Sequence, residues 1–565
     1  MSNTSIKEIF QNFVQANTVE LTTQSFNLLV TALNFPKDYP AFRDAVLPHV
    51  NFRMKTLFTN LDNKFNCYAE LRKHSEKSEN KNVLVSGGGP CGLRAAVDAK
   101  LSGLDVTLVE LRDDFTRHNI IKTWKATIDD LVGFGLTTFV PGIQLHGHLH
   151  LGTREIQTCL LKSALIFGVK IFFNRGVCGI IDPSVTMNTE NNSSKSWKVW
   201  TLPAAEAKIY LKRPTAAPEV SLTTGASDTS NLTKYSKCDF IEYNSVDDTI
   251  ILKDLDKVNA LPNTVEIIEF NTLLIAEGES SVLIRRLGFD RCITKFNEAI
   301  GLVVNLDFTQ EAMKPSAPER KIPEIVLTRA AAQWRDTPLG KIADIGIEFE
   351  NIEYMRGSTH FIAASTKLKN LHTFQIVKDI KPKVKESLNI NNLDLEKLRK
   401  LGLQIALELG LPKNITLSEK NGVQIFDFSA KGQCADTLKF FKSMNENLNE
   451  ALILPIGDSF QNPFWPQGLG INRGFHSSLD GVWSAYQYAT DISKDIVENE
   501  RKFSYQMCNW GSNSLDASLK NWTCDPISRY SVISISRAIY LREKIDGKPS
   551  TIPQRIIEFV GVENF

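Results

Sequence analysis

The 565-residue sequence lacks several features that would place it in a specialised class of protein. Its nine cysteines are scattered without a C-x-x-C pair, which argues against a disulfide framework and against a structural zinc site. No apolar run reaches the ~20 residues of a membrane span, and the N-terminus lacks the basic and apolar regions of a secretory signal. We therefore expect reduced thiols in a cytoplasmic setting, with no metal site and no membrane partner.

Neither sign of charge predominates. The 65 Lys and Arg residues are balanced by 64 Asp and Glu, so the formal net charge of +1 gives no reason to expect nucleic acid or an anionic membrane as a partner. A content of 42% hydrophobic and 23% charged residues is that of an ordinary globular protein. The length exceeds a single hydrophobic core, so we expect two or three subdomains.

The most informative stretch is a glycine-rich turn between an apolar run at 83–85 and a helix expected from about 91 to 102. Its pattern is G-x-G-x-x-G. Gly87 allows the tight turn, Gly89 lets a pyrophosphate approach the backbone, and Gly92 lets the helix pack closely on the strand. The N–H groups and the dipole at the start of the helix favour a phosphate. This arrangement predicts a dinucleotide site.

A second strand, 106–109, follows and ends in Glu110. An acidic residue about 20 residues after the glycines is the expected acceptor for a ribose hydroxyl. A glycine turn in a βαβ unit without a ligand remains the alternative. Helices near 127–134 and 154–167, then a strand at 169–173, continue the alternation, which predicts an α/β fold with a doubly wound parallel sheet.

Composition and periodicity divide the chain into five parts. In chain order we expect a helical N-terminal segment at 1–80, a dinucleotide-binding domain at 81–285 whose polar insert near 182–263 hangs on a small antiparallel sheet, a substrate-side subdomain with a β-sheet at 286–435, a return to the first domain at 436–490, and a helical or irregular tail without clear chemistry at 491–565.

Two later turns complete a recognisable order of elements. One apolar strand ends in Glu277 and Gly278, and another ends in Gly457 and Asp458 ahead of a helix. Together with the first glycine turn, this order resembles flavoproteins of the p-hydroxybenzoate hydroxylase type. Asp458 can accept a hydrogen bond from the ribityl hydroxyls of FAD. The helix behind it offers N–H groups where negative charge gathers on flavin reduction.

Three stretches carry a closer resemblance. Residues 87–94 (GGGPCGLR), 110–119 (ELRDDFTRHN) and 463–466 (PFWP) are similar to the monooxygenase domain of the MICAL proteins. The likeness continues in order along most of the chain. It implies a Rossmann-like FAD-binding domain with a monooxygenase subdomain, FAD as cofactor, NADPH as co-substrate and O₂ as the source of oxygen. In that family the acceptor is a methionine sulfur on actin, and hydrogen peroxide is released when no acceptor is present.

The same resemblance implies specific site residues. Glu110 would bind the adenosine ribose, while Arg112 and Arg117 would meet the adenine or the pyrophosphate; solvated surface charges are the alternative for the two arginines. Cys91 is either a small residue packed beside the cofactor or a thiol activated by the helix N-terminus. The catalytic residues implied beside the isoalloxazine are Trp465, Asn119 and Lys122. The FAD contacts implied are Gly87, Gly89, Cys91, Gly92, Glu110, Arg112, Arg117, His118, Asn119, Gly179, Phe361 and Asp458.

The sequence also departs from the family pattern. Glu277 stands where the wider class has Asp, Lys122 replaces a histidine near the flavin, and Phe361 replaces a tyrosine that touches the cofactor. We expect no calponin-homology or LIM module within these residues. The alternatives to a MICAL-like monooxygenase are a flavin-dependent hydroxylase of a small aromatic or other metabolite, and a non-catalytic binding protein that keeps the FAD-type scaffold.

Overall fold

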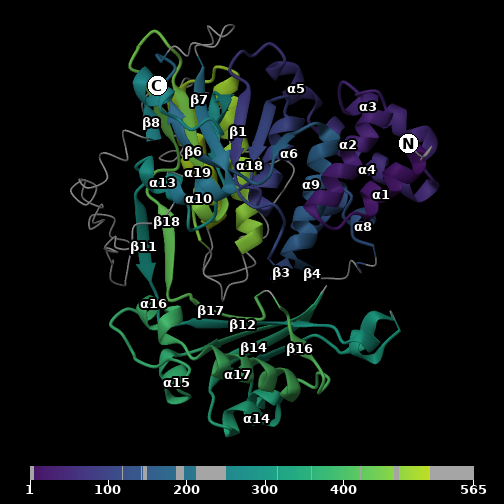
Figure 1. Ribbon diagram of the computed structural model, residues 1–565, viewed down its shortest axis with the longest axis vertical. Coiled ribbons are helices and arrows are strands. Elements are labelled where there is room, and N and C mark those ends of the chain that lie inside the picture. The colour runs from purple at the N-terminus through teal and green to yellow at the C-terminus, as the bar shows by residue number, and fades with distance from the viewer. Residues whose placement is uncertain are drawn as a thin grey trace.

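The computed structural model describes residues 5–117, 119–141, 143, 149–185, 196–211, 250–314, 316–357, 359–419, 421–462, 470–509 and 547. Most of the polar insert therefore lies outside the described residues. Figure 1 shows a larger α/β body, a layer of N-terminal helices on one side of it, and a second β-rich body below. No helix of the described residues has the length and apolar character needed to cross a membrane.

The N-terminal layer consists of helices that begin at capping side chains. Ser5, Thr18, Asp38 and Asn51 each accept a hydrogen bond from a backbone N–H of the first helical turn, which explains where the four longer helices begin. The helices are α1 (Ile6–Gln15), α2 (Val19–Ala32), α3 (Tyr39–Val46), α4 (Phe52–Cys67) and α5 (Ala69–Ser75).

A six-stranded sheet forms the centre of the larger body, with the order β19-β20-β10-β1-β2-β5. All neighbouring pairs run parallel except β19 and β20. The predicted α/β fold with a doubly wound parallel sheet is confirmed. Its strands are β1 (Asn82–Ser86), β2 (Asp105–Val109), β5 (Lys170–Phe172), β10 (Thr272–Ile275), β19 (Lys439–Phe441) and β20 (Ala451–Pro455).

Alternate residues of β1 point to different layers. Val83 and Val85 belong to the core shared with the covering helices, whereas Leu84 packs in a separate core with Ile180 and Phe270 of a smaller sheet. That sheet was expected to be antiparallel, but β8 runs parallel to β6. The covering helices are α6 (Pro90–Leu101), α9 (Thr153–Phe167) and α18 (Gly470–Ala489), with α19 (Lys494–Asn509) packed on α18; the smaller sheet comprises β6 (Arg175–Ile181), β7 (Trp197–Pro203), β8 (Ile251–Leu252) and β9 (Glu266–Phe270).

The second body is a twisted antiparallel sheet with helices on its outer face (Figure 1). Helix α17 (Leu395–Glu408) buries Leu398, Leu401 and Ile405, whereas Leu407 is exposed. Its other main elements are β12 (Ile300–Asp307), β13 (Ile325–Thr328), β14 (Phe349–Arg356), β15 (His360–Thr366), β16 (Thr416–Leu417), β17 (Val423–Asp427), α14 (Pro338–Asp344), α15 (Leu368–Thr373) and α16 (Val384–Ser387).

Paired strands and side-chain contacts join the bodies. The antiparallel pair β11 (Arg291–Lys295) and β18 (Ala430–Cys434) runs between them. The hairpin of β3 (Ile120–Thr123) and β4 (Leu149–Gly152) contacts the second body directly. Ile120 packs against Phe361, and the Nδ1 atom of His150 lies 2.7 Å from Oε2 of Glu324.

Candidate functional site: a dinucleotide groove

A groove of about 330 Å³ opens where four neighbouring strands of the central sheet end. The chain leaves β1 for β2 on one side and later returns to β10 on the other, so the strand order reverses at β1. Ligands of doubly wound sheets bind at such a switch point, beyond the carboxyl ends of the strands. The segments after β1, β2, β10 and β20 contribute Gly87, Gly89, Cys91, Glu110, Arg112, Arg117, Glu277, Gly278 and Asp458 to the lining.

The three glycines of the first turn have different surroundings. Gly87 has φ +108°, and a Cβ there would lie 2.5 Å from the carbonyl oxygen of Ala276 on the neighbouring strand. A Cβ on Gly92 would lie 1.9 Å from the carbonyl oxygen of Gly87. A Cβ on Gly89 would meet no atom within 4 Å, although Gly89 lines the groove. Gly87 and Gly92 thus permit close packing, and Gly89 leaves room for a ligand.

Glu110 is buried at the end of β2 and is held by the backbone. Its Oε2 accepts a hydrogen bond from the N–H of Gly88 at 2.5 Å, and its Oε1 accepts one from the N–H of Arg112 at 2.9 Å. The exposed guanidinium of Arg112 lies 3.5 Å from Oε1. A carboxylate fixed in this way keeps lone pairs for the hydroxyls of a ribose.

Asp458 lies on the same groove, beyond the end of β20. Burial raises the pKa of Asp458 to about 6; Glu279 acts in the same direction, while Arg117 and Arg291 oppose the rise. No group among the described residues donates a hydrogen bond to its carboxylate. The side chain is therefore available to a ligand hydroxyl.

Glu277 closes the wall of the groove at the end of β10. Its Oε1 accepts a hydrogen bond from the hydroxyl of Ser86 at 2.6 Å, and its Oε2 accepts one from the hydroxyl of Ser281 at 2.7 Å. Ser281 caps α13 (Val282–Arg286), so Glu277 ties β1 to that helix. Burial raises the pKa of Glu277. The longer carboxylate at this departure from the family pattern thus has two partners within the protein.

Cys91 is half-buried at the start of α6, against the turn that carries Asp458. A Cβ on Gly457 would lie 2.9 Å from its Sγ atom, which shows how closely the two segments pack. Burial raises the pKa of Cys91 to about 12, and Asp458 adds to the effect. A thiol with a raised pKa is not an activated nucleophile, so the structure favours the packed residue over the reactive thiol.

Several residues implied by the resemblance do not line the groove; one is Gly92, which packs against Gly87 inside the turn. Gly179 lies in β6 against the indole of Trp200, and the same strand contributes Gly176 and Val177 to the groove instead. The other three gather at the β3–β4 hairpin. Phe361 packs on Ile120, the backbone of Asn119 accepts hydrogen bonds from Thr153, and Lys122 is exposed with its Nζ atom 5.8 Å from the ring centroid of Trp124. His118 and Trp465 lie outside the described residues.

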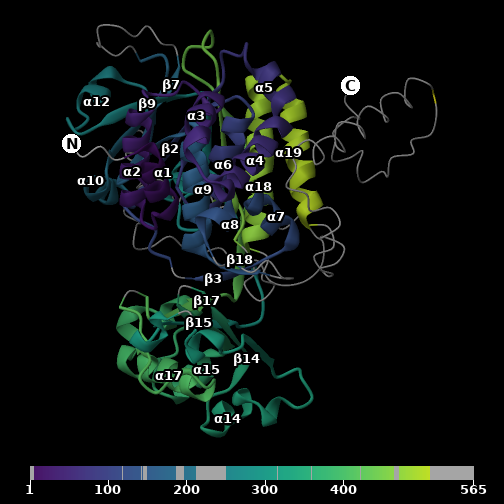
Figure 2. The ribbon, with the colours of Figure 1, turned by 90° about the vertical axis from the view of Figure 1, so that its right-hand side faces the viewer.

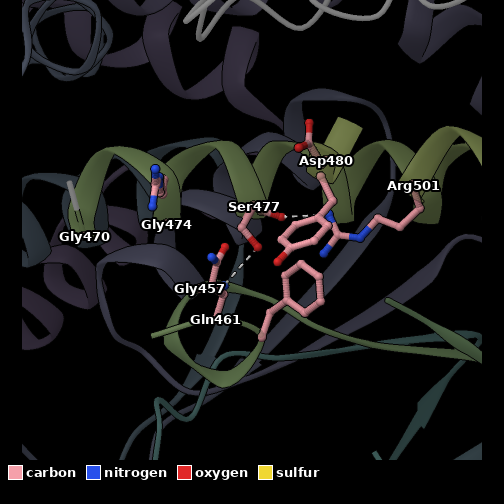
Figure 3. Close-up of a pocket in the computed structure, with 10 residues that line it drawn as sticks. Gly457, Gln461, Gly470, Gly474, Ser477, Asp480 and Arg501 are labelled. Atoms are coloured by element: carbon pink, nitrogen blue, oxygen red, sulfur yellow. Dashed lines mark hydrogen bonds between the residues drawn. The ribbon is translucent and has the colours of Figure 1, made fainter. Parts of the chain in front are cut away.

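A small second pocket of about 20 Å³ lies behind the Gly457 turn (Figure 3). Arg501 of α19 donates hydrogen bonds to the carbonyl oxygens of Pro455 at 3.0 Å and of Ser477 at 3.3 Å. The hydroxyl of Ser477 accepts a hydrogen bond from the N–H of Gly457 at 3.1 Å. Helix α19, which we expected to have no clear chemistry, therefore fixes the turn that presents Asp458.

Sequence reasoning missed three residues at these sites: Gln157, Glu277 as a structural link, and Arg501. The side-chain amide of Gln157 donates to the carbonyl oxygen of Gly88 at 3.0 Å. A glutamine on the buried face of a helix was the available signal for that contact. No local pattern marks Arg501. The described residues contain no group of three or more His, Cys, Asp and Glu side chains placed to hold a metal ion.

Comparison with known proteins gives the same family as the three sequence stretches. No protein-family model matches the chain. This chain is 24% identical over 558 residues to F-actin monooxygenase MICAL2 of Mus musculus, and 25% identical over 562 residues to F-actin monooxygenase mical1 of Danio rerio. The resemblance to the MICAL monooxygenases is confirmed. Each match covers 96% of this chain, but it spans only 25% of the mouse MICAL2 protein and 40% of zebrafish mical1.

Solved structures give a weaker likeness. The Diels-Alderase PyrE3 matches with a TM-score of 0.44 and 12% identity, over 86% of this chain and 81% of its own. A complex of aklavinone-11 hydroxylase with FAD and aklavinone matches with a TM-score of 0.42 and 13% identity, over 75% of this chain and 66% of its own. At these scores the structural likeness supports no conclusion about function.

Proposed function

We propose that this protein is an FAD-dependent monooxygenase that uses NADPH and O₂. The observation that carries the proposal is the convergence of the glycine turn, Glu110, Glu277 and Asp458 on one groove, from four strand ends that are far apart in the sequence. The MICAL relatives along 96% of the chain support the same activity. The scattered cysteines are typical of a reducing compartment, so a cytoplasmic location stays a prediction.

The groove residues fit the parts of FAD. Glu110 would accept the ribose hydroxyls of the adenosine, and the open space at Gly89 would admit the pyrophosphate beside the first turn of α6. Asp458 would accept a hydrogen bond from the ribityl chain. Bound FAD would supply the redox chemistry, transferring electrons from NADPH to O₂. Lys122 and Asn119 on the β3 side, together with Trp465, would line the approach to the flavin ring.

We further propose that the oxygen acceptor is a methionine sulfur on filamentous actin. Relatives carry the names F-actin monooxygenase and protein-methionine sulfoxide oxidase. In the balanced reaction one oxygen atom of O₂ forms the sulfoxide and the other leaves as water. NADPH gives two electrons, and one proton is taken up. The changes at Lys122 and Phe361 alter the neighbourhood of the flavin, so actin is the part of the proposal that most needs a direct test.

Replacing Gly89 by Val tests the groove. The new side chain would occupy open space in the lining and exclude the pyrophosphate, so we expect the variant to purify without flavin absorbance even after FAD is added. Far-UV circular dichroism provides the control that the fold is retained. A folded Gly89→Val protein with a full equivalent of FAD would contradict the proposed site.

The acceptor is tested by NADPH oxidation with and without filamentous actin, followed by mass spectrometry of the actin. We expect actin to accelerate NADPH consumption and to gain methionine sulfoxide. Turnover that ignores actin but responds to a small aromatic compound would contradict actin as acceptor and favour a metabolite hydroxylase. No NADPH oxidation by the FAD-loaded protein would contradict the enzyme itself.

A further inference from the structure

The antiparallel pair of β11 and β18, which we call the ribbon, also bonds to the segment around Asp458. Figure 2 shows β18 between the larger body and the second body. Residues 432–434 of β18 pair with residues 460–462 through an antiparallel bridge, flanked by backbone hydrogen bonds of 2.8 and 2.9 Å. The chain that follows the Asp458 turn is therefore held against the ribbon by its backbone.

Arg291 of β11 reaches the turn itself. Its guanidinium donates hydrogen bonds to the carbonyl oxygen of Asp458 at 3.2 Å and to that of Ser459 at 3.4 Å. It also donates to the carbonyl oxygen of Glu279, at 3.4 Å, in the segment that follows β10. The planar fork of an arginine holds several acceptors in a fixed geometry. One half-buried side chain of the ribbon thus connects the segments that follow β10 and β20.

Gly432 of the ribbon leaves the space that Arg291 occupies. A Cβ on Gly432 would lie 2.7 Å from Nε of Arg291 and 3.1 Å from Oδ1 of Asn462. Any side chain at this position would therefore displace the arginine or the chain that follows the Asp458 turn. The missing side chain on one strand of the ribbon gives room to the long side chain on the other.

The charge of Arg291 also acts on the carboxyl group of Asp458. Burial raises the pKa of Asp458 to about 6, and the charge of Glu279 acts in the same direction. Arg117 and Arg291 oppose the rise. Cys91, which also faces Asp458, is a neutral thiol at neutral pH because burial raises its own pKa to about 12. Removing Arg291 would leave Arg117 as the one cation of this group that favours the ionised carboxylate.

We propose that Arg291 is a positioning residue for the cofactor, which fixes from the ribbon the turn that presents Asp458 to the ribityl chain. The inference rests on the proposed function, in which the groove binds FAD. Arg291 does not line the groove, so it acts through Asp458 and not by touching the cofactor. Its positive charge favours the carboxylate form, which accepts the hydrogen bond of a ribityl hydroxyl.

Hydrogen exchange of the full-length protein, before FAD is added, tests the hold on the turn. In Arg291→Met we expect peptides that contain residues 456–461 to exchange at least about tenfold faster, because charged hydrogen bonds to the turn are lost. Gly432→Ala, which crowds the arginine, should have the same effect. Lys295→Met removes an exposed positive charge from the other end of β11 and is the matched control. Exchange in Arg291→Met that equals that of the wild type would overturn the positioning role.

Fluorescence titration with FAD at several pH values tests the role toward the cofactor. For Arg291→Met we expect affinity at pH 7 to fall about tenfold, and the pH at which binding weakens to move upward by about one unit. Arg291→Lys keeps the charge and should keep the wild-type pH profile. A structural loss alone would weaken binding equally at every pH, so an unshifted profile in Arg291→Met would overturn the inference. A wild type that binds no FAD at any pH would instead contradict the proposed function, and this inference with it.

Discussion

Asp458 is a groove residue whose pKa lies well above the ordinary value of a carboxyl group. Burial raises its pKa from 3.8 to about 6. Because the folded state holds this proton more tightly than the unfolded chain, the contribution of Asp458 to stability is fully present below about pH 4 and is lost as the pH rises to about 6. A ligand that donates a hydrogen bond to the carboxylate favours the ionised form, so ligand binding and proton release are coupled.

This coupling predicts that FAD binds more tightly as the pH rises from about 5 to about 7, by up to about tenfold per pH unit below the pKa. Asp458→Asn cannot ionise and should bind FAD with a flat pH profile. Fluorescence titration of the flavin at several pH values measures both. Identical profiles for the two proteins would show that Asp458 does not meet the cofactor.

The most predictable residues of the groove were those placed by a local sequence pattern. Gly87, Gly89, Gly92 and Glu110 follow from a spacing that a strand, a turn and a helix impose on any dinucleotide site. Gln157 was not predictable, because it reaches Gly88 only through the packing of α9 beside α6. Lys122, Asn119 and Phe361 lie at the β3–β4 hairpin and do not line the groove. Their roles beside the flavin therefore stay predictions.

At the scale of elements, a buried ionic network joins the N-terminal helices to α6, the helix that follows the glycine turn. Nε of Arg94 on α6 lies 2.8 Å from Oδ2 of Asp130, and Nζ of Lys64 on α4 lies 2.7 Å from Oδ1 of the same carboxylate. The hydroxyl of Tyr68 donates to Asp98, which precedes the end of α6. Arg94 and Asp130 therefore each depend on a partner from another helix, whereas Asp98 also pairs with Arg94 of its own helix.

Replacing Arg94 by Met should lower the free energy of unfolding by about 3–5 kcal/mol, since Asp130 would keep a buried charge with only Lys64 to balance it. Lys125→Met, which breaks the exposed pair with Asp129, is the control and should change stability by less than about 1 kcal/mol. Urea unfolding measures both. Equal effects of the two substitutions would contradict a structural role for the network.

Helix ends were easier to predict than helix faces. Capping side chains such as Asn51 lie next to the turn they stabilise, so the start of α4 is a local matter. Which side of a helix is buried depends on what packs there. On α17, Leu407 is exposed while Ala406 is buried, and on α2 the polar residues Thr22 and Ser25 are buried while Leu28 is exposed. Hydrophobic periodicity alone could not distinguish these outcomes.

At the scale of the molecule, the larger body builds the groove and the second body contacts it through the β3–β4 hairpin. Strand ends of the larger body build the groove, and Phe361 of the second body packs on Ile120 of the hairpin. The alternation of strands and helices predicted the parallel sheet. It could not predict that β10 would lie beside β1 and β20 beside β10, because strand neighbours are fixed by tertiary packing and not by sequence order.

Incorporation of labelled oxygen tests the central claim most directly. The FAD-loaded protein is supplied with NADPH, filamentous actin and ¹⁸O₂ in the presence of catalase, which removes any free hydrogen peroxide. The proposed monooxygenase should produce actin peptides whose methionine gains about 18 Da, where ordinary oxygen would add about 16 Da. Methionine without the label, or labelled methionine that disappears when catalase is added, would contradict direct oxygen transfer by this protein.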